Sequence, residues 1–377
     1  MLFTVTNECY RRVIMKKVLV PSSKGCPRCG EGSGVLLEDG RILLVYTCFT
    51  GNEDHAPGEL FSAYFDPETG DFTDRKMILK KGHYINQMSI SLERLADNSI
   101  ALAWGRKFSQ HHDRWFFCRS PDEGKSWSEP RIMCPEHPAD YLVSNNDRLR
   151  QLKNGRLVLP VCAYPRGFDG SPLPSFLELW YSDDVGEKWH RSGVIAPCQA
   201  PPKPDPYAAE ASFEEICDSP FLEQEPGVEE CADGTLYYFC RTPLGYMYNA
   251  WSQDQGKTFT ELTPQKDIIS PLAPQAIRRQ PGSNRLWCVY NDRSSVVFGD
   301  PEKHWSWRTP LTIAYSDDNG HSWKNWKQIE DDSHNYCYTS LTFAGKLLVM
   351  TYYESENRPD GTRRNLASFK AQCVELP

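Results

Sequence analysis

The segment SDDNGHSW, from Ser316 to Trp323, decides the fold. Its pattern, Ser-x-Asp-x-Gly-x-x-aromatic, suits the corner of a β-hairpin. The Asp carboxylate accepts backbone N–H bonds, Gly supplies a left-handed residue, and the aromatic ring anchors the turn against its sheet. The same pattern recurs three more times at intervals of 62 to 70 residues, as SPDEGKSW from Ser120, SDDVGEKW from Ser182 and SQDQGKTF from Ser252. A worn fifth copy, DPETGDF, starts at Asp66. Such self-similarity predicts a β-rich repeat protein.

A second repeat alternates with these Asp boxes. It is a tight turn of Gly, Asn or Asp, residues that tolerate positive φ, followed by an apolar strand. Six such strands are expected, at 42–46, 100–104, 157–161, 236–239, 286–290 and 347–352. Units of this size fit four-stranded blades, whose radial repetition protects the sheet edges. The sequence therefore predicts an all-β fold, a single six-bladed β-propeller with four-stranded antiparallel blades over residues 1–377, with a Pro-rich inserted loop at about 198–224.

Charge and composition exclude several classes of partner. The formal net charge of -8 argues against binding to nucleic acid or to an anionic membrane surface. Residues 1–21 are interrupted by five charged side chains, so they offer neither a signal core nor a membrane span. We therefore expect a cytoplasmic protein. The sequence gives no signal of its oligomeric state.

The chain has 14 cysteines, and many of them lie inside apolar, strand-like runs. Cysteine in such a run behaves as a small buried hydrophobe, and reduced thiols are the default without a secretion signal. Cys26 and Cys29 have the spacing of metal ligands, but no second such pair completes a tetrahedral set. The sequence therefore predicts no metal and no cofactor.

In their number and rhythm, the Asp boxes resemble those of the sialidase (neuraminidase) superfamily of glycoside hydrolases, also called BNR-repeat proteins. The resemblance covers essentially the whole chain. It implies an exo-acting hydrolase that releases a terminal, acidic sugar from a glycoconjugate or oligosaccharide, with a tyrosine nucleophile and retention. Asp boxes also occur in propellers that are not sialidases, so they support the fold and not the chemistry.

Five residues match family positions in the expected chain order, and the resemblance gives each a role. Asp54 in NEDHA is the acid/base, Glu225 in EPGVEECADG is the partner of the nucleophile, and Tyr338 in YCYTSL is the nucleophile. Arg241 and Arg308 hold the substrate carboxylate. A sialoside carries that carboxylate on its anomeric carbon, where it repels an anionic nucleophile, whereas a phenol is neutral until a paired base removes its proton. Guanidinium groups bind carboxylates bidentately.

The first strand departs from the family pattern. Family members place an arginine there in an Arg-Ile-Pro-type segment, whereas the matching stretch here is CGEGSG from Cys29. The arginine position falls at about Gly30, beside Glu31. Arg28, two residues away, is a candidate substitute, but strand alternation does not guarantee the direction of its side chain. A glutamate in the pocket repels a carboxylate and prefers hydroxyls or an amine, so the identity of the sugar stays open.

Further candidates for substrate binding are weaker matches. The segment SNNDR precedes the third turn-strand unit, where a propeller strand begins near the axis, so Asn146, Asp147 and Arg148 are candidates to contact sugar hydroxyls. Tyr164 resembles a family position that lines the pocket, and His55 follows Asp54 directly. Two alternatives remain at this point. One is a glycosidase or lyase for a different sugar that uses Glu31 and the 146–148 cluster, and the other is a non-catalytic carbohydrate-binding propeller.

Overall fold

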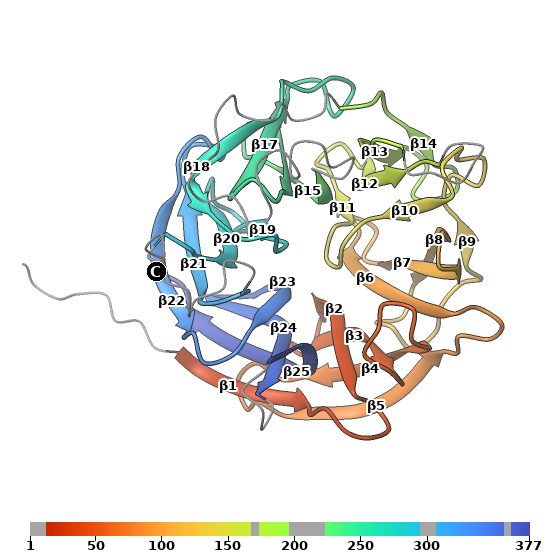
Figure 1. Ribbon diagram of the computed structural model, residues 1–377, viewed down its shortest axis with the longest axis vertical. Helices are drawn as coiled ribbons and strands as arrows, with labels where there is room; N and C mark the ends of the chain where they lie inside the picture. The colour runs from red at the N-terminus through yellow and green to blue at the C-terminus, as the bar shows by residue number, and fades with distance from the viewer. Residues whose placement is uncertain (1–12, 167–172, 196–222, 295–306, 358–362) are drawn as a thin grey trace, which may run out of the picture.

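The computed structural model describes residues 13–166, 173–195, 223–294, 307–357 and 363–377. In these ranges the chain forms 25 β-strands and no helix. The strands make six antiparallel sheets that stand as blades around a common axis (Figure 1). The predicted six-bladed propeller is therefore confirmed.

Each of the first three blades is a run of consecutive strands. Blade 1 comprises β2 (Arg28–Leu36), β3 (Ile42–Phe49), β4 (Gly58–Phe65) and β5 (Phe72–Leu79). Blade 2 comprises β6 (Asn86–Arg94), β7 (Ile100–Ser109), β8 (His112–Ser120) and β9 (Arg131–Ile132). Blade 3 comprises β10 (Tyr141–Val143), β11 (Arg150–Gln151), β12 (Leu157–Tyr164), β13 (Phe176–Ser182) and β14 (His190–Arg191). Its innermost strand is interrupted, because β10 and β11 both pair with β12.

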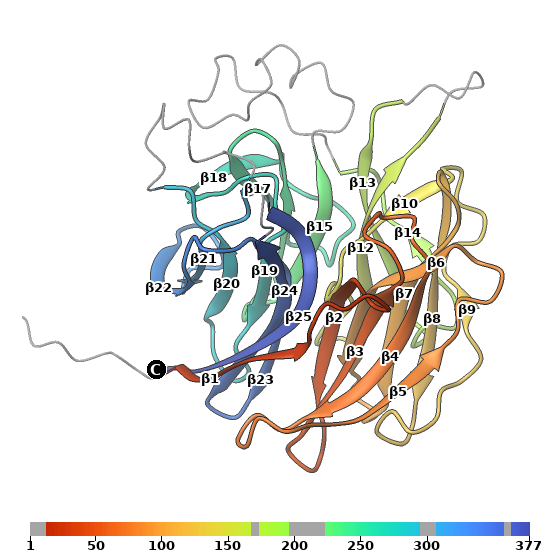
Figure 2. The same ribbon diagram turned by 60° about the horizontal axis from the view of Figure 1, so that its bottom comes forward.

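Blades 4 and 5 follow the same order, and blade 6 closes the ring. Blade 4 comprises β15 (Gln224–Glu230), β16 (Leu236–Arg241), β17 (Tyr246–Ser252) and β18 (Thr263–Ile269). Blade 5 comprises β19 (Ala276–Arg279), β20 (Leu286–Asn291), β21 (Leu311–Ser316) and β22 (Lys324–Glu330). Blade 6 comprises β23 (Tyr336–Ala344), β24 (Leu347–Asn357), β25 (Arg363–Glu375) and β1 (Val13–Val20). Figure 2 shows β1 beside β25, so hydrogen bonds between the two ends of the described chain close the propeller.

The two predicted repeats fall at two different corners of the blades. All six predicted apolar strands begin at the residue expected, as the second strand of each blade. The four Asp boxes join the third strand to the fourth in blades 2 to 5. In one of them, the Asp254 carboxylate accepts N–H bonds from Lys257 at 3.0 Å and Thr258 at 2.9 Å. The degenerate fifth copy forms the same kind of turn, since Asp66 Oδ1 accepts N–H bonds from Glu68 at 2.8 Å and Thr69 at 3.1 Å.

Asp-box residues also join neighbouring blades. The box ring Trp189 of blade 3 packs against Phe117 of blade 2, with ring centroids 5.6 Å apart, and Trp323 packs against Tyr237 of blade 4 at 5.9 Å. Gly320 of the same box has φ of 84°, and a Cβ at that position would lie 2.3 Å from the Tyr237 ring. The boxes therefore fix both a turn and the contact between blades.

Strand direction places the two faces of the propeller. Because neighbouring strands in a blade are antiparallel, the turns after the first and third strands open on one face. The starts of the innermost strands and the connections from second to third strands open on the other. Asp54 lies in such a connection, and Glu225 and Tyr338 lie near the starts of β15 and β23. The fold therefore carries the predicted catalytic residues to one face, opposite the Asp boxes.

The predicted inserted loop at 198–224 falls outside the described residues except at its end, where Gln224 begins β15. The described residues contain no helix of the length and apolarity that crossing a membrane requires.

Candidate active site

Four innermost strands share a distortion near their starts. The register between the first two strands of the blade shifts by a β-bulge, and one bulge residue takes the left-handed conformation. These residues are Glu31 with φ of 50°, Ser89 with 58°, Glu225 with 47° and Tyr338 with 58°. A bulge re-aims a side chain that regular strand alternation would send elsewhere. All four side chains line the same cavity.

That cavity lies between blades 1, 2, 3, 4 and 6. Its lining comprises Glu31, Asp54, Met88, Ser89, Gly105, Lys107, Asp113, Trp115, Tyr141, Leu142, Val143, Ser144, Glu225 and Tyr338. A wider hollow of about 360 Å³ adjoins it and shares Asp54 and Tyr141. The cavity, of about 70 Å³, and the hollow share two lining residues, so they are neighbouring parts of one recess.

Tyr338, Glu225, Arg241 and Arg308 form one connected set, here called the tyrosine group. Tyr338 Oη donates to Glu225 Oε1 at 3.2 Å, and Arg241 Nη1 lies 3.2 Å from Glu225 Oε2. The Arg308 guanidinium carbon lies 5.4 Å from the centre of the Tyr338 ring. Strands of blades 4 and 6 and the β20–β21 connection of blade 5 thus bring together four residues that are up to 113 positions apart in the chain.

The environment of Tyr338 controls its proton. Burial and the negative charge of Glu225 raise the pKa of the phenol above its ordinary value, whereas Arg241 and Arg308 act to lower it. The phenol is therefore neutral in the resting site. It becomes an oxyanion only if Glu225 accepts its proton, which is the arrangement of a nucleophile with a paired base.

Arg28, Glu31 and Asp54 form a second set, here called the first-blade group. The Arg28 guanidinium forms ion pairs with both carboxylates, and its Nη1 lies 2.7 Å from Asp54 Oδ1. The side chains of Arg28 and Glu31 are each only 1% exposed. The first strand thus brings an arginine, Arg28, beside Glu31 and Asp54, although the position matched to the family arginine is Gly30.

Arg28 also connects the two groups. Its Nε donates to Tyr353 Oη at 3.2 Å, and the Tyr353 ring packs edge-on against Tyr338 with centroids 6.0 Å apart. Gly30 allows this arrangement, since a Cβ there would lie 2.5 Å from the Tyr353 ring. The departure from the family pattern at Gly30 thus makes room for Tyr353.

Charge balance in the first-blade group sets the proton affinity of its carboxyls. Burial raises the pKa of Glu31, against the attraction of Arg28. Loss of hydration works against ionisation of Asp54 as well, but Arg28 outweighs it and lowers the pKa of Asp54. Asp54 is the more accessible of the two, because its side chain is 66% exposed.

The 146–148 cluster lies on the axis but bonds to the protein itself. The Asn146 amide donates to the carbonyls of Gly32 at 2.7 Å and Tyr338 at 3.0 Å. Arg148 donates to the carbonyls of Pro226 and Gln275.

Asp147 forms ion pairs with Arg150 and Arg278, at 3.3 and 2.9 Å. Asn146, Asp147 and Arg148 are at most 2% exposed, and none lines the cavity. In this structure they are therefore not placed to contact sugar hydroxyls, as the sequence had led us to expect, and their role is structural. They join the innermost strands of the blades.

Tyr164 and His55 both line the wider hollow rather than the cavity. The Tyr164 ring packs on Tyr141, with centroids 5.8 Å apart. His55 Nδ1 is buried without a hydrogen-bond partner in the described chain. Burial and the nearby Lys107 lower the pKa of His55, so the neutral ring is favoured.

Sequence reasoning missed two charged residues of the cavity, Lys107 and Asp113. Lys107 Nζ donates to the Asp54 carbonyl at 3.2 Å, and burial lowers the pKa of its ammonium group. Asp113 accepts the Leu142 N–H at 2.7 Å, and burial raises the pKa of its carboxyl to about 8. Lys107 and Asp113 are partners in the β7–β8 ladder, next to the turn that joins the two strands. Two opposite charges on either side of this hairpin were the feature of the sequence that could have indicated them.

Comparison with known proteins identifies the family of the chain. The model of the BNR repeat-like domain family matches residues 60–350. Sialidase-3 of Rattus norvegicus is 29% identical over 182 residues, which cover 45% of this chain and 38% of that protein. The chain thus matches well under half of the length of this relative. The match to the family model covers most of the chain, which therefore belongs to the BNR repeat-like family of the sialidase superfamily.

Solved structures repeat the fold at low sequence identity. An intramolecular trans-sialidase from Ruminococcus gnavus, in complex with oseltamivir carboxylate, has a TM-score of 0.70 at 13% identity, covering 94% of this chain and 96% of that one. The sialidase of Trypanosoma rangeli, in complex with 2,3-difluorosialic acid as a covalent intermediate, has a TM-score of 0.69 at 14% identity, covering 96% and 58%. At such identities the likeness establishes the fold alone.

Proposed function

We propose that this protein is an exo-acting, retaining glycoside hydrolase that releases a terminal acidic sugar, with Tyr338 as its nucleophile. The observation that carries the proposal is the 3.2 Å hydrogen bond from Tyr338 to Glu225 in the lining of the cavity, with an arginine next to each residue. A structural tyrosine needs no carboxylate base and no pair of arginines beside it. The sialidase relatives are consistent with the same class of reaction.

The first chemical step uses three residues. Glu225 accepts the phenolic proton as Tyr338 oxygen attacks the anomeric carbon, and Asp54 protonates the leaving oxygen. The sugar is then held through its anomeric carbon on Tyr338. In the second step Asp54 takes a proton from water, the water oxygen attacks the same carbon, and Tyr338 leaves with its proton returned from Glu225. Two displacements on one carbon retain its configuration.

Arg241 is the strongest candidate to bind the substrate carboxylate. Its Nε is buried and has no hydrogen-bond acceptor in the described chain, and its Nη1 meets Glu225 Oε2 as an ion pair without hydrogen-bond geometry. Buried donors without a partner are costly, so they favour a ligand that supplies oxygen atoms. Arg308 stands over the Tyr338 ring and adds a second positive charge. A carboxylate next to the anomeric carbon would satisfy both requirements.

A substrate panel tests the proposal. The purified chain is assayed on aryl sialosides, on related ulosonides that lack the N-acetyl group, and on neutral glycosides of the same leaving group. We expect turnover of at least one acidic member and none of the neutral ones. Turnover of neutral glycosides alone would contradict the proposal. Binding of the sugars by calorimetry without any hydrolysis would favour the non-catalytic propeller instead.

A further inference from the structure

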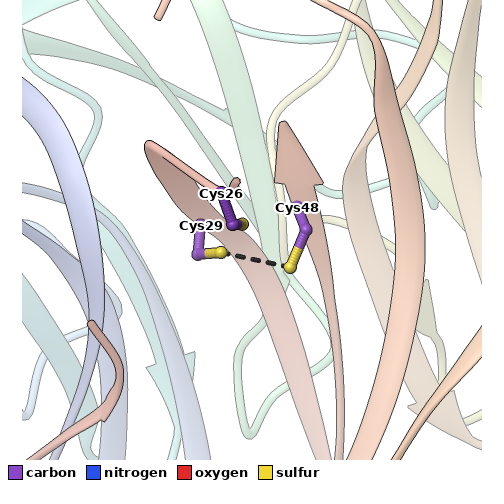
Figure 3. Close-up of side chains that lie close together, drawn as sticks. All are labelled: Cys26, Cys29 and Cys48. Carbon is purple, nitrogen blue, oxygen red and sulfur yellow. Dashed lines mark hydrogen bonds between the residues drawn. The ribbon is translucent and has the colours of Figure 1, made fainter. Parts of the chain in front are cut away.

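Three cysteine thiols lie together in blade 1, outside the cavity. The Sγ atoms of Cys26, Cys29 and Cys48 all lie within 4.8 Å of one another, and those of Cys29 and Cys48 are 3.1 Å apart (Figure 3). We call these three residues the thiol cluster. The sequence shows only the Cys26–Cys29 pair as ligand-like, because the third thiol comes from the neighbouring strand.

Local structure explains why the thiols converge. Cys29 of β2 and Cys48 of β3 are direct partners in the antiparallel ladder, so their side chains share a face of the sheet. Cys26 precedes β2 in a turn closed by two backbone hydrogen bonds between Ser23 and Cys26, at 3.0 and 3.2 Å. This turn brings Cys26 back over the pair. Cys29 and Cys48 are buried, and Cys26 is half-buried at the outer side.

We propose that the thiol cluster binds a soft metal cation, Zn²⁺ or Cu⁺, through three thiolates. A zinc–sulfur bond of about 2.3 Å in tetrahedral geometry separates sulfur atoms by about 3.8 Å. The Cys29–Cys48 separation of 3.1 Å is shorter than that value, and no separation among the three sulfur atoms exceeds 4.8 Å, so small side-chain rotations would reach the metal-bound geometry. Soft thiolates select such cations over Mg²⁺ or Ca²⁺. Each thiol loses its proton to solvent as its sulfur binds the metal, and the half-buried side at Cys26 is open for a water ligand.

The charge around the cluster fits an occupied site. Three thiolates with one Zn²⁺ carry one net negative charge, which needs a positive partner when it is buried. Arg75 supplies it, because its Nη2 donates to Cys48 Sγ at 3.1 Å. Its Nε donates to Tyr46 Oη at 2.8 Å, which fixes the direction of the guanidinium group. An apolar core that only buried three neutral thiols would not require this cation.

The thiol cluster also borders the first-blade group. Arg28 lies between Cys26 and Cys29 in the chain, and its guanidinium carbon stands 4.3 Å from the centre of the Phe49 ring, next to Cys48. A metal ion would join the turn before β2 to the end of β3 at this point. It would act as a structural clamp beside the pocket, and this inference holds whatever reaction the pocket performs.

Titration with Cd²⁺, a spectroscopic substitute for Zn²⁺, tests the proposal. The full chain is reduced, freed of metal with a chelator, and followed by ultraviolet thiolate-to-metal absorption. We expect one Cd²⁺ per chain, displaced by Zn²⁺, and a protein that melts at a higher temperature when loaded. Cys26→Ser, at a half-buried position that tolerates a hydroxyl, should keep the fold and lower the affinity by more than about 100-fold. Cys118→Ala, a buried cysteine in blade 2, is the matched control and should bind as the parent does.

Two results would overturn the proposal. The first is an absorption band and affinity that are unchanged in Cys26→Ser, or are absent in the parent. The second is a Cys29–Cys48 disulfide in the protein purified without reductant, detected by mass spectrometry of the digested chain. A disulfide would remove two of the three ligands, and the 3.1 Å separation would then belong to a redox pair.

Discussion

The tyrosine group and the first-blade group both contribute residues to the lining of the pocket, and their charges are balanced in opposite ways. In the tyrosine group a single carboxylate, Glu225, faces two arginines. In the first-blade group a single arginine, Arg28, is shared by two carboxylates. This difference indicates where an anionic substrate group fits. The tyrosine group has an excess of positive charge and suits a carboxylate, whereas the first-blade group suits hydroxyls and the leaving oxygen.

Removal of the nucleophile in the tyrosine group should have the largest effect on activity. Tyr338→Phe deletes the attacking oxygen and leaves the ring, so we expect kcat/KM to fall at least about 10³-fold with little change in stability. Steady-state kinetics and thermal melting measure the two effects. Tyr290→Phe, which removes a buried hydroxyl bonded to Asn325 at 2.7 Å, is the matched control and should keep full activity.

Removing the base comes next. Glu225→Gln keeps the size of the side chain but cannot accept the phenolic proton, so we expect kcat to fall by about 10²- to 10³-fold. Arg241 would lose its carboxylate partner in this variant, and the affinity for an anionic product should hold or improve. Kinetics together with product inhibition measure both quantities. An unchanged kcat would show that Glu225 is not the base.

Replacement of Asp54 separates the two groups by leaving-group chemistry. Asp54→Asn should lower kcat/KM by about 10²-fold on alkyl glycosides and by less than about tenfold on aryl glycosides, whose leaving groups need no acid. The low pKa of Asp54 means that the acid form is lost as pH rises through that value. We therefore expect kcat/KM of the parent on alkyl substrates to fall with rising pH from the acid side, and this limb to vanish in Asp54→Asn. Equal losses on both substrate types would assign Asp54 another role.

Glu31→Gln changes the charge balance of the first-blade group. The variant frees Arg28 from one of its two carboxylates, so KM for an anionic substrate should fall by roughly tenfold while kcat is kept. The alternative that places the chemistry on Glu31 expects the opposite, loss of turnover in Glu31→Gln and tolerance of Tyr338→Phe. Parallel kinetics of the two variants distinguish these hypotheses.

An Asp box provides the smallest effect on activity. Asp254→Ala removes four hydrogen bonds at the face opposite the pocket, from Ser252, Lys257 and both the N–H and hydroxyl of Thr258. We expect a loss of about 1–2 kcal/mol in the free energy of unfolding and no change in kcat/KM. Urea denaturation measures the first and kinetics the second. A large loss of activity in a folded variant would contradict the separation of fold from site.

The fold could be predicted because its signals are local. An Asp box needs only eight consecutive residues, and each hairpin turn needs two or three, so both repeats are legible without tertiary structure. The starts of the second strands followed directly from their Gly, Asn and Asp turns. The order of the tyrosine group along the chain was likewise legible from family-like segments.

The pocket could not be predicted from the sequence where a bulge or a neighbouring blade determines the direction of a side chain. The ion pair between Arg28 and Glu31 could not be predicted, because the shift of register between Gly30 and Ser33 breaks strand alternation. Asp147 looked available beside the axis, but Arg278 of blade 5 occupies its carboxylate. Cys48 joined Cys26 and Cys29 only through strand pairing. Contacts of this kind depend on the assembled propeller.

Trapping of the covalent intermediate is the most direct test that Tyr338 is the nucleophile. A 2,3-difluorosialic acid reagent carries a good leaving group at C2, and the fluorine at C3 slows the hydrolysis of the intermediate. After incubation with the protein, intact mass spectrometry and peptide mapping locate any bound sugar. The account predicts one sugar per chain, attached to Tyr338 oxygen and absent in Tyr338→Phe. A sugar attached to Glu31, Asp54 or Glu225, or rapid turnover with no trapped species, would contradict it.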